Sequence, residues 1–287
     1  MGIGACAHQS LWLRDGGTKL TIRLVALDID GTLLTPGVAV DAMPGDPMSD
    51  AVTALLRQNI VVVLASGRMF PGTASVARHL GINQPLICQQ GASVHEVDGS
   101  LRHGYSIDVT IATELLAYAN DNDWPLAWFD SLRYLVTRPC EQAQFFADVS
   151  QVTMEIAPEP LASGVVATGI DIISGRARAS TVHAEVKARY PGRLSLLDFP
   201  SVTAVHAPEA SKGNALRELA NELYIARDEV LTIGDSVNDA SMLAWAGNSA
   251  APEHCDDYAR AAAKEILPGA GVQGVIARLR RVIDQLE

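Results

Sequence analysis

Short runs of β-branched and aliphatic residues, each followed by a polar turn, mark the first part of the chain. Residues 22–28 read IRLVALD and lead into a Gly-Thr turn, and residues 60–65 read IVVVLA and lead into a Ser-Gly-Arg turn. Apolar runs of this length, bounded by turn residues, are typical of strands that are buried on both faces of a parallel sheet. A short third strand is predicted at residues 85–88.

Helical patterns fill the segments between these strands. Proline and glycine interrupt residues 36–50, so a loop is predicted there. Gly81 is predicted to end a helix, because glycine readily takes the left-handed conformation found at helix ends. The predicted helices of this part and of the C-terminal part cover residues 49–58, 73–80, 212–223, 239–246 and 272–286, with a further strand at 229–233. This alternation predicts an α/β fold with a doubly wound, mostly parallel, Rossmann-like core sheet.

The middle of the chain has a different character. Residues 89–205 hold every Phe except Phe70 and two of the four Trp. Helical patterns at 109–120 and 141–149 alternate there with strand-like segments at 133–136 and 169–173. The sequence therefore predicts a core of residues 21–88 and 206–287 and a large inserted α+β cap of residues 89–205. Residues 1–20 lack the apolar centre of a signal peptide and are predicted to be a disordered extension.

Composition and charge narrow the possible partners. The 287 residues include 22 Lys and Arg against 33 Asp and Glu, a formal net charge of −11, which disfavours binding to nucleic acid. No apolar run approaches the ~18 residues of a membrane span, so no membrane partner is predicted. The four cysteines are far apart and form no Cys-x-x-Cys pair, which is typical of a protein of the reducing cytoplasm.

Four acidic residues follow predicted buried strands. Asp28 and Asp30 follow the first strand, and Asp235 and Asp239 follow the strand at 229–233. The carboxyl ends of parallel strands form the ligand crevice of an open α/β sheet, so these carboxylates are expected to meet. They would repel one another without a cation, and their hard oxygen ligands suit Mg²⁺. A single Asp at such a place commonly only caps a helix or a turn.

Two groups in the insertion allow two interpretations each. Trp124, Trp128, Phe129 and Tyr134 are either the core of the cap or an aromatic wall for a ring-shaped ligand. His183, Glu185 and Lys187 are either one face of a strand that lines a site or a solvated edge.

Four segments occur in order along the chain: DIDGTLL at 28–34, SGR at 66–68, SKG at 211–213 and GDSVND at 234–239. Together they resemble the four motifs of the haloacid dehalogenase (HAD) superfamily. The forms DIDGTLL, LASGR and GDSVNDASML are most similar to its Cof-type phosphatases. The resemblance covers residues 21–287 and implies that the insertion is a cap that closes over the site and supplies specificity.

The resemblance implies a role in phosphoryl transfer for each matching residue. Asp28 is implied to be the nucleophile, which forms an aspartyl-phosphate that water then hydrolyses. Asp30 is implied to be the general acid for the leaving alcohol and then the base for water, which requires surroundings that favour its protonated form. Lys212 is implied to neutralise the charge that the nucleophile and the phosphate share.

The resemblance also implies a metal site. The carboxylates of Asp28 and Asp235 and the backbone carbonyl of Asp30 are implied to hold Mg²⁺. Asp239 is implied to support the metal through water or an indirect contact.

The phosphate is implied to lie among residues of three motifs. Ser66, the backbone N–H of Gly67 and Lys212 are implied to bind phosphoryl oxygens, and Asn238 to orient the nucleophile or the phosphate. Arg68 either belongs to this group or pairs with a carboxylate.

Two departures from the Cof-type pattern bear on substrate fit and metal support. Gln90-Gly91-Ala92 stands where Asn-Gly-Ala is common, and His254-Cys255 stands where Asn-Ala is common. His254 is predicted to be a surface or cap residue rather than a metal ligand.

The sequence thus predicts a cytoplasmic, Mg²⁺-dependent phosphatase that hydrolyses a small phosphomonoester metabolite, such as a sugar phosphate. One alternative is a phosphomutase similar to phosphomannomutase, which would use the same Asp28 and Asp30 but keep the intermediate from water. A second alternative is a non-catalytic metabolite-binding protein on the same fold. The oligomeric state is not predicted.

Overall fold

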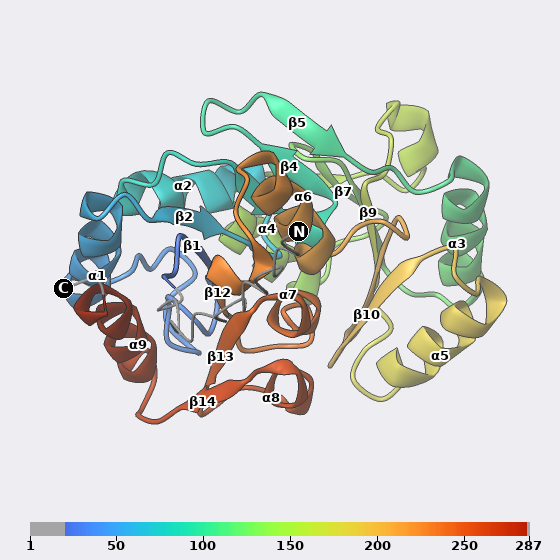
Figure 1. Cartoon of the computed structure of the whole chain (residues 1–287). Coiled ribbons are helices and arrows are strands. Elements are labelled where there is room, and N and C mark those ends of the chain that lie inside the picture. Colours follow the sequence, from blue (N-terminus) through green and yellow to red (C-terminus); the bar gives the residue numbers. More distant parts are fainter. Residues whose placement is uncertain (1–20, 286–287) are drawn as a thin grey trace, which may run out of the picture.

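The computed structural model describes residues 21–285, so the prediction for residues 1–20 lies outside the described residues. A parallel sheet of five strands forms the core, in the order β14-β13-β12-β1-β2 (Figure 1). These strands are β1 (Leu24–Leu27), β2 (Val61–Leu64), β12 (Val230–Ile233), β13 (Asn248–Pro252) and β14 (Glu265–Leu267). All residues of β1 and β12 are buried, as expected for strands covered on both faces.

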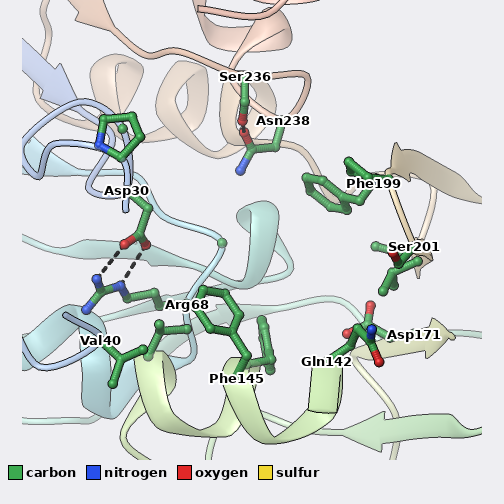
Figure 2. Close-up of a pocket in the computed structure, with 18 of the residues that line it drawn as sticks. Asp30, Val40, Arg68, Gln142, Phe145, Asp171, Phe199, Ser201, Ser236 and Asn238 are labelled. Carbon is green, nitrogen blue, oxygen red and sulfur yellow. Dashed lines mark hydrogen bonds and ion pairs between the residues drawn. The ribbon is translucent and has the colours of Figure 1, made fainter. Parts of the chain in front are cut away.

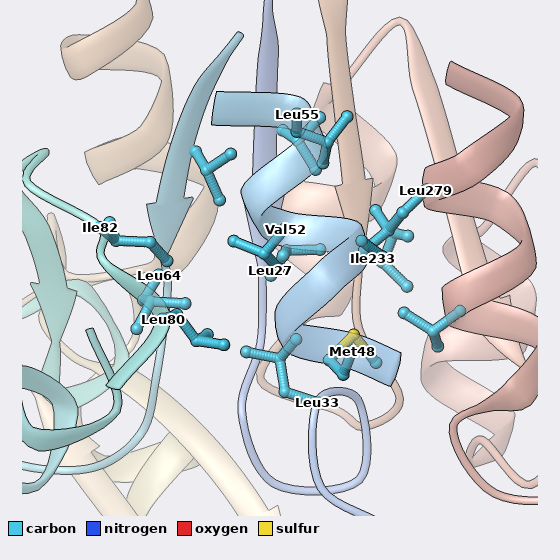
Figure 3. Close-up of a cluster of buried hydrophobic side chains, with 14 of the residues drawn as sticks. Leu27, Leu33, Met48, Val52, Leu55, Leu64, Leu80, Ile82, Ile233 and Leu279 are labelled. Carbon is cyan, nitrogen blue, oxygen red and sulfur yellow. The ribbon is translucent and has the colours of Figure 1, made fainter. Parts of the chain in front are cut away.

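Helices cover both faces of this sheet because successive strand residues point to opposite sides. Val25 and Leu27 pack in one cluster, whereas Leu24 and Ala26 pack in another. The first cluster includes residues of α1 (Asp46–Arg57), α2 (Phe70–Leu80) and α9 (Gln273–Asp284), and the second includes residues of α6 (Lys212–Glu222) and α7 (Ala240–Trp245). Figure 3 shows the first cluster, with α1 lying across the sheet. A further short helix, α8 (Asp257–Ala262), packs against α7.

The predicted starts of the first two helices were wrong for one physical reason. Both helices begin earlier than predicted and carry a proline in the first turn, Pro47 in α1 and Pro71 in α2. Proline is tolerated there because the first backbone N–H groups of a helix have no partner within the helix. The predicted end of α2 is confirmed, since Gly81 takes the left-handed conformation at φ 70°.

A small antiparallel sheet lies beside β2. It contains β3 (Leu86–Cys88), β4 (Ser93–His95) and β5 (Leu101–Gly104), and a parallel bridge joins Ala65 to Ile87. The 3-10 turn Gln89–Gly91 connects β3 to β4, and both Gln89 and Gln90 have positive φ, at 49° and 61°. Non-glycine residues rarely adopt this conformation, and it is often kept at functional positions.

A second sheet, of six strands, forms most of the cap on the other side of the molecule (Figure 1). Its order is β10-β11-β9-β6-β7-β8, and every neighbouring pair is antiparallel except β7 with β8. The strands are β6 (Leu126–Phe129), β7 (Tyr134–Val136), β8 (Met154–Ile156), β9 (Gly169–Ile172), β10 (Ser195–Phe199) and β11 (Val202–His206). The predicted α/β fold with an inserted α+β region is therefore confirmed.

The two faces of the cap sheet have different coverings. Helices α3 (Val109–Asp121) and α5 (Ala179–Arg189) pack on one face, where Trp128 and Ile170 lie. Helix α4 (Glu141–Ser150) packs on the other face, with Phe129 and Tyr134. The connecting 3-10 turns Pro160–Ser163 and Arg227–Glu229 complete the described elements.

Two sequence interpretations are corrected here. His183, Glu185 and Lys187 lie on α5 and not on a strand, so they do not share one strand face. The aromatic group is divided between two faces of the cap sheet. Trp128 is cap core and donates its indole N–H to the Val165 carbonyl, at 2.9 Å, whereas Phe129 and Tyr134 line a cavity.

Candidate active site

The ends of β1 and β12 bring Asp28 and Asp235 together. Gly31, in the loop after β1, has φ +93°, and a Cβ built on it would lie 2.2 Å from an Asp235 carboxylate oxygen. Only glycine fits such a close approach in this conformation. Thr32 in the same loop donates its hydroxyl to Asp235 at 3.2 Å. The two strand ends are thus held against each other by backbone contact and a hydrogen bond.

A buried charge cluster lies at this edge of the sheet. Asp28, Asp235 and Asp239 each offer a carboxylate oxygen, and these oxygens all lie within 4.8 Å of one another. The Lys212 ammonium, which is fully buried, donates to Asp28 at 2.6 Å and to Asp239 at 2.7 Å. The first turn of α6 supplies this lysine, and the Ser211 hydroxyl caps the helix.

Three carboxylates surround one buried lysine in this cluster, and burial together with their mutual repulsion shifts the pKa values. Burial, followed by repulsion from Asp239, raises the pKa of Asp28 well above its ordinary value, although Lys212 acts in the opposite direction. Burial and Asp239 likewise raise the pKa of Asp235 to about 7. Burial alone would lower the pKa of Lys212, but the charges of Asp239 and Asp28 outweigh it and raise that pKa. The donor set therefore fits a hard divalent cation.

Asp239 differs from the other two carboxylates. One of its oxygens accepts the backbone N–H groups of Asp235 and Ser236, each at 3.0 Å, and the other accepts the Lys212 ammonium. The side chain is fully buried. Asp239 therefore shapes the loop after β12 and positions Lys212, which suits indirect support of a metal.

The Asp30 carboxylate lies outside this cluster and pairs with Arg68. The Arg68 guanidinium donates to both Asp30 oxygens, at 2.8 and 2.6 Å (Figure 2). The Asp30 side chain is 52% exposed, whereas that of Arg68 is 3% exposed. Of the two interpretations of Arg68 from the sequence, pairing with a carboxylate is the one observed.

Of the predicted phosphate-binding residues, Lys212 belongs to the charge cluster, and Gly67 and Asn238 lie against the Gln90 side chain. The buried Ser66 hydroxyl accepts the Arg68 backbone N–H at 3.1 Å. Asn238 donates its amide to the Gln90 side-chain oxygen at 2.8 Å, and a Cβ on Gly67 would lie 2.5 Å from the Gln90 amide nitrogen. Gln90 thus contacts residues of two motifs, Gly67 and Asn238. The departure from Asn-Gly-Ala marked this position in the sequence but did not predict these contacts.

A cavity of about 830 Å³ lies between the charge cluster and the cap sheet. Asp28, Asp30, Arg68 and Asp235 line it from the core, among other residues. Its cap wall is mainly apolar and includes Phe129, Tyr134, Phe145, Phe146, Asp171 and Phe199. Figure 2 shows Asp30 and Arg68 on one side of the cavity and Asp171 and Gln142 on the other.

The family model of haloacid dehalogenase-like hydrolases matches residues 25–279. The chain belongs to the haloacid dehalogenase-like hydrolase family. It is 30% identical over 259 residues to a phosphoglycolate phosphatase of Halorubrum lacusprofundi, a match that covers 89% of this chain and 96% of that protein. It is 31% identical over 243 residues to a putative phosphatase of Bacillus subtilis, which covers 78% and 85% of the two chains.

Solved structures of the family share the fold. A putative HAD/COF-like hydrolase from Plasmodium vivax superimposes with a TM-score of 0.82 at 21% identity, over 94% of this chain and 98% of that one. The predicted recognition and the predicted class of enzyme, a hydrolase of the phosphatase type, are confirmed. Within residues 21–285, no helix has the length and hydropathy needed to cross a membrane.

The second departure from the Cof-type pattern has a structural role in this hydrolase. His254 lies near the carbonyl oxygen of Gly31, with its Nε2 at 2.7 Å. The backbone N–H of Asp256, two residues on, donates to the Asp235 carbonyl at 2.9 Å. The loop after β13 therefore contacts both the loop that follows Asp28 and the backbone of Asp235.

Proposed function

We propose that this hydrolase is a Mg²⁺-dependent phosphatase that hydrolyses a small phosphomonoester through an aspartyl-phosphate on Asp28. One observation carries the proposal: Asp28 lies at the wall of a large cavity, among carboxylates, with the buried Lys212 ammonium on its oxygen. A nucleophilic carboxylate must be ionised. Burial and Asp239 raise the pKa of Asp28 and oppose that form, whereas Lys212 favours it, and a bound cation would favour it further.

The residues present fit a magnesium ion. The carboxylates of Asp28 and Asp235 and the backbone carbonyl of Asp30 would hold it, and Asp239 would support it indirectly. When bound, the ion supplies positive charge that offsets the charge of the carboxylates and of the phosphoryl group.

Asp30 would transfer the protons. We propose that its exposed carboxyl leaves Arg68 and, in its protonated form, gives its proton to the oxygen of the departing alcohol. Asp30 would then accept a proton from the water that attacks phosphorus and splits the aspartyl-phosphate, which regenerates the Asp28 carboxylate and releases phosphate.

The phosphoryl oxygens would lie among fixed donors. We assign them to the Ser66 hydroxyl, the Gly67 backbone N–H and the Lys212 ammonium, with Asn238 orienting the phosphate. Positioned donors of this kind act most strongly as charge spreads over the transferring phosphoryl group.

The division of the chain stays a proposal: residues 21–88 and 206–287 as the catalytic core and residues 89–205 as the cap. The pairing of β4 and β5 with β3 attaches residues 93–104 to the core side, so the cap sheet begins at β6. A cytoplasmic location is proposed as well, and the free state of the described cysteines, Cys88, Cys140 and Cys255, supports it.

The test uses p-nitrophenyl phosphate and a panel of phosphorylated metabolites, with Mg²⁺ or with EDTA. Wild-type protein should release phosphate only with Mg²⁺, and Asp28→Asn should abolish release. Asp121→Asn, the same change at an exposed position of α3, is the matched control and should keep full activity. Undiminished turnover in Asp28→Asn would refute the nucleophile. Tight binding of a panel member without turnover by the wild type would favour a binding protein, and recovery of an isomeric phosphate would favour a phosphomutase.

A further inference from the structure

Asp171 occupies the centre of the cap sheet, on the face that lines the cavity. On β9 it lies opposite Ala127 of β6 and Ala204 of β11, the two neighbouring strands. Both neighbours have small side chains, so they leave space above the carboxylate. Ile170 and Ile172, on either side of Asp171 in sequence, point to the opposite face and pack in the core with α3 and α5.

Mainly apolar side chains surround this carboxylate, and the Gln142 side chain lies beside it (Figure 2). Phe129, Tyr134 and Ile173 belong to the buried apolar cluster of the same cap region, and all three line the cavity. Asp171 is 8% exposed, and within residues 21–285 its carboxylate has no hydrogen bond or ion pair. The Tyr134 hydroxyl is also buried without a hydrogen-bond partner in this part of the chain. Asp171 thus presents to the cavity a carboxylate without a hydrogen-bond partner among the described residues, with the closed-off Tyr134 hydroxyl on the same sheet.

An unpaired buried carboxylate costs stability, so its presence needs a reason other than folding. Burial alone raises the pKa of Asp171 to about 7. A group of this kind in a cavity is a candidate for binding or catalysis. Asp171 comes from the cap and lies across the cavity from the pair of Asp30 and Arg68 (Figure 2), where the leaving group of a bound phosphomonoester would extend.

Resting on the proposed phosphatase activity, we propose that Asp171 is a specificity-determining residue that accepts a hydrogen bond from an O–H or N–H⁺ group of the leaving alcohol. Phe129, Phe145 and Phe199 form the apolar wall around the body of the ring. The substrate class is a phosphomonoester of a neutral or cationic ring alcohol. An anionic leaving group, such as glycolate, would place its carboxylate in an apolar cavity facing Asp171.

Arg176 is the cavity-lining cation of the cap that bears on this proposal. The Arg176 side chain is exposed and forms no ion pair with Asp171 within residues 21–285, so solvent screens its charge. The size of the cavity also favours a ring alcohol over glycolate as the leaving group, because about 830 Å³ exceeds the space that a two-carbon acid needs.

The test compares sugar phosphates that differ in the charge of the leaving group: glucosamine 6-phosphate, glucose 6-phosphate and 6-phosphogluconate, with phosphoglycolate as a fourth. Wild-type protein should prefer the first two by kcat/KM. Asp171→Asn should raise KM for glucosamine 6-phosphate by about ten- to a hundred-fold, the loss of one hydrogen bond to a charged group, with a smaller effect on kcat. It should also lower the ratio of kcat/KM for glucosamine 6-phosphate to kcat/KM for 6-phosphogluconate.

Two further variants separate recognition from folding. Asp121→Asn, at an exposed position of α3 in the same region, is the matched control, because its side chain is not among those that line the cavity. Tyr134→Phe removes only a hydroxyl that is buried away from the ligand, so it should leave KM nearly unchanged. Equal KM changes in Asp171→Asn and Asp121→Asn, or a wild-type preference for phosphoglycolate, would overturn the proposal.

A separate binding measurement distinguishes this proposal from the proposed function. Calorimetry with glucosamine 6-phosphate on Asp28→Asn, and on Asp28→Asn with Asp171→Asn, needs no turnover. If the wild type releases no phosphate but the second substitution still weakens binding ten-fold or more, the phosphatase proposal fails and the role of Asp171 stands. Unchanged binding overturns the role of Asp171 even in an active enzyme.

Discussion

Buried carboxylates at the two ends of the cavity differ in their hydrogen-bond partners. At the core end, Asp28 has a raised pKa but bonds to Lys212 at 2.6 Å, and Asp239 is held by backbone N–H groups and by the same lysine. At the cap end, Asp171 has a raised pKa and no partner among the described residues. A network of fixed charges keeps a geometry that chemistry requires, whereas an unpaired group is ready for a partner that arrives with the ligand.

The largest expected effect breaks the core network. Lys212→Met should leave two buried carboxylates without their cation and lower the free energy of unfolding by about 3–5 kcal/mol. It should also reduce kcat by about a thousand-fold or more, as expected when a charge that acts on the transition state is lost. Urea unfolding and phosphate release measure the two effects. Lys187→Met, at an exposed position of α5, is the control and should change neither. Near-wild-type stability of Lys212→Met would show that the ion pairs of Lys212 with Asp28 and Asp239 contribute little to the free energy of unfolding.

The next effect adds the predicted cation. Mg²⁺ at a hundred times its dissociation constant should raise the free energy of unfolding of the wild type by about 2.7 kcal/mol. Asp235→Asn should remove most of this gain, whereas Asp171→Asn should keep it, because only the core end of the cavity would hold the metal. Thermal unfolding with and without EDTA measures the difference. An equal loss of the gain in both variants would contradict the comparison.

A smaller effect concerns the cost of the unpaired acid. The pKa of Asp171 is about 7 in the folded protein against an ordinary value of 3.8, so the folded state binds the extra proton between these values. The contribution of Asp171 to stability is therefore present below pH 3.8 and is lost as pH rises through 7. Asp171→Asn should be more stable than wild type by about 1–3 kcal/mol at pH 8, and the difference should shrink toward pH 4. Urea unfolding at the two pH values tests this, with Asp121→Asn, at an exposed position, as the control. A difference independent of pH would contradict it.

The smallest expected effect tests whether Gln90 acts with the core end of the cavity or with its cap end. Gln90→Asn keeps the amide but draws it back from Asn238, so we expect KM to rise a few-fold for every substrate, with little change in its order of preference. Initial rates on glucosamine 6-phosphate, glucose 6-phosphate, 6-phosphogluconate and phosphoglycolate give the KM values. A change in the order of preference would place Gln90 with the cap as a residue of specificity.

Much of the core end could be predicted because its information is local. Buried apolar runs end in Asp28 and Asp235, and parallel strands bring their carboxyl ends to one edge whatever the rest of the chain does. The starts of α1 and α2 were missed because proline reads as a helix breaker, although the first turn accepts it. The segment of α5 was misread as a strand face, since its alternating polar residues fit both patterns over a short stretch.

The sequence alone therefore determined the family, the alternation of strands and helices, and the acidic residues at the strand ends. Tertiary structure alone decided that Arg68 pairs with Asp30, that Gln90 reaches Asn238, and that Asp171 faces the cavity between two alanines. The physical reason is the distance along the chain. A motif is read within a few residues, but the cap wall is assembled from strands and a helix whose facing side chains are fixed only when the sheet has formed.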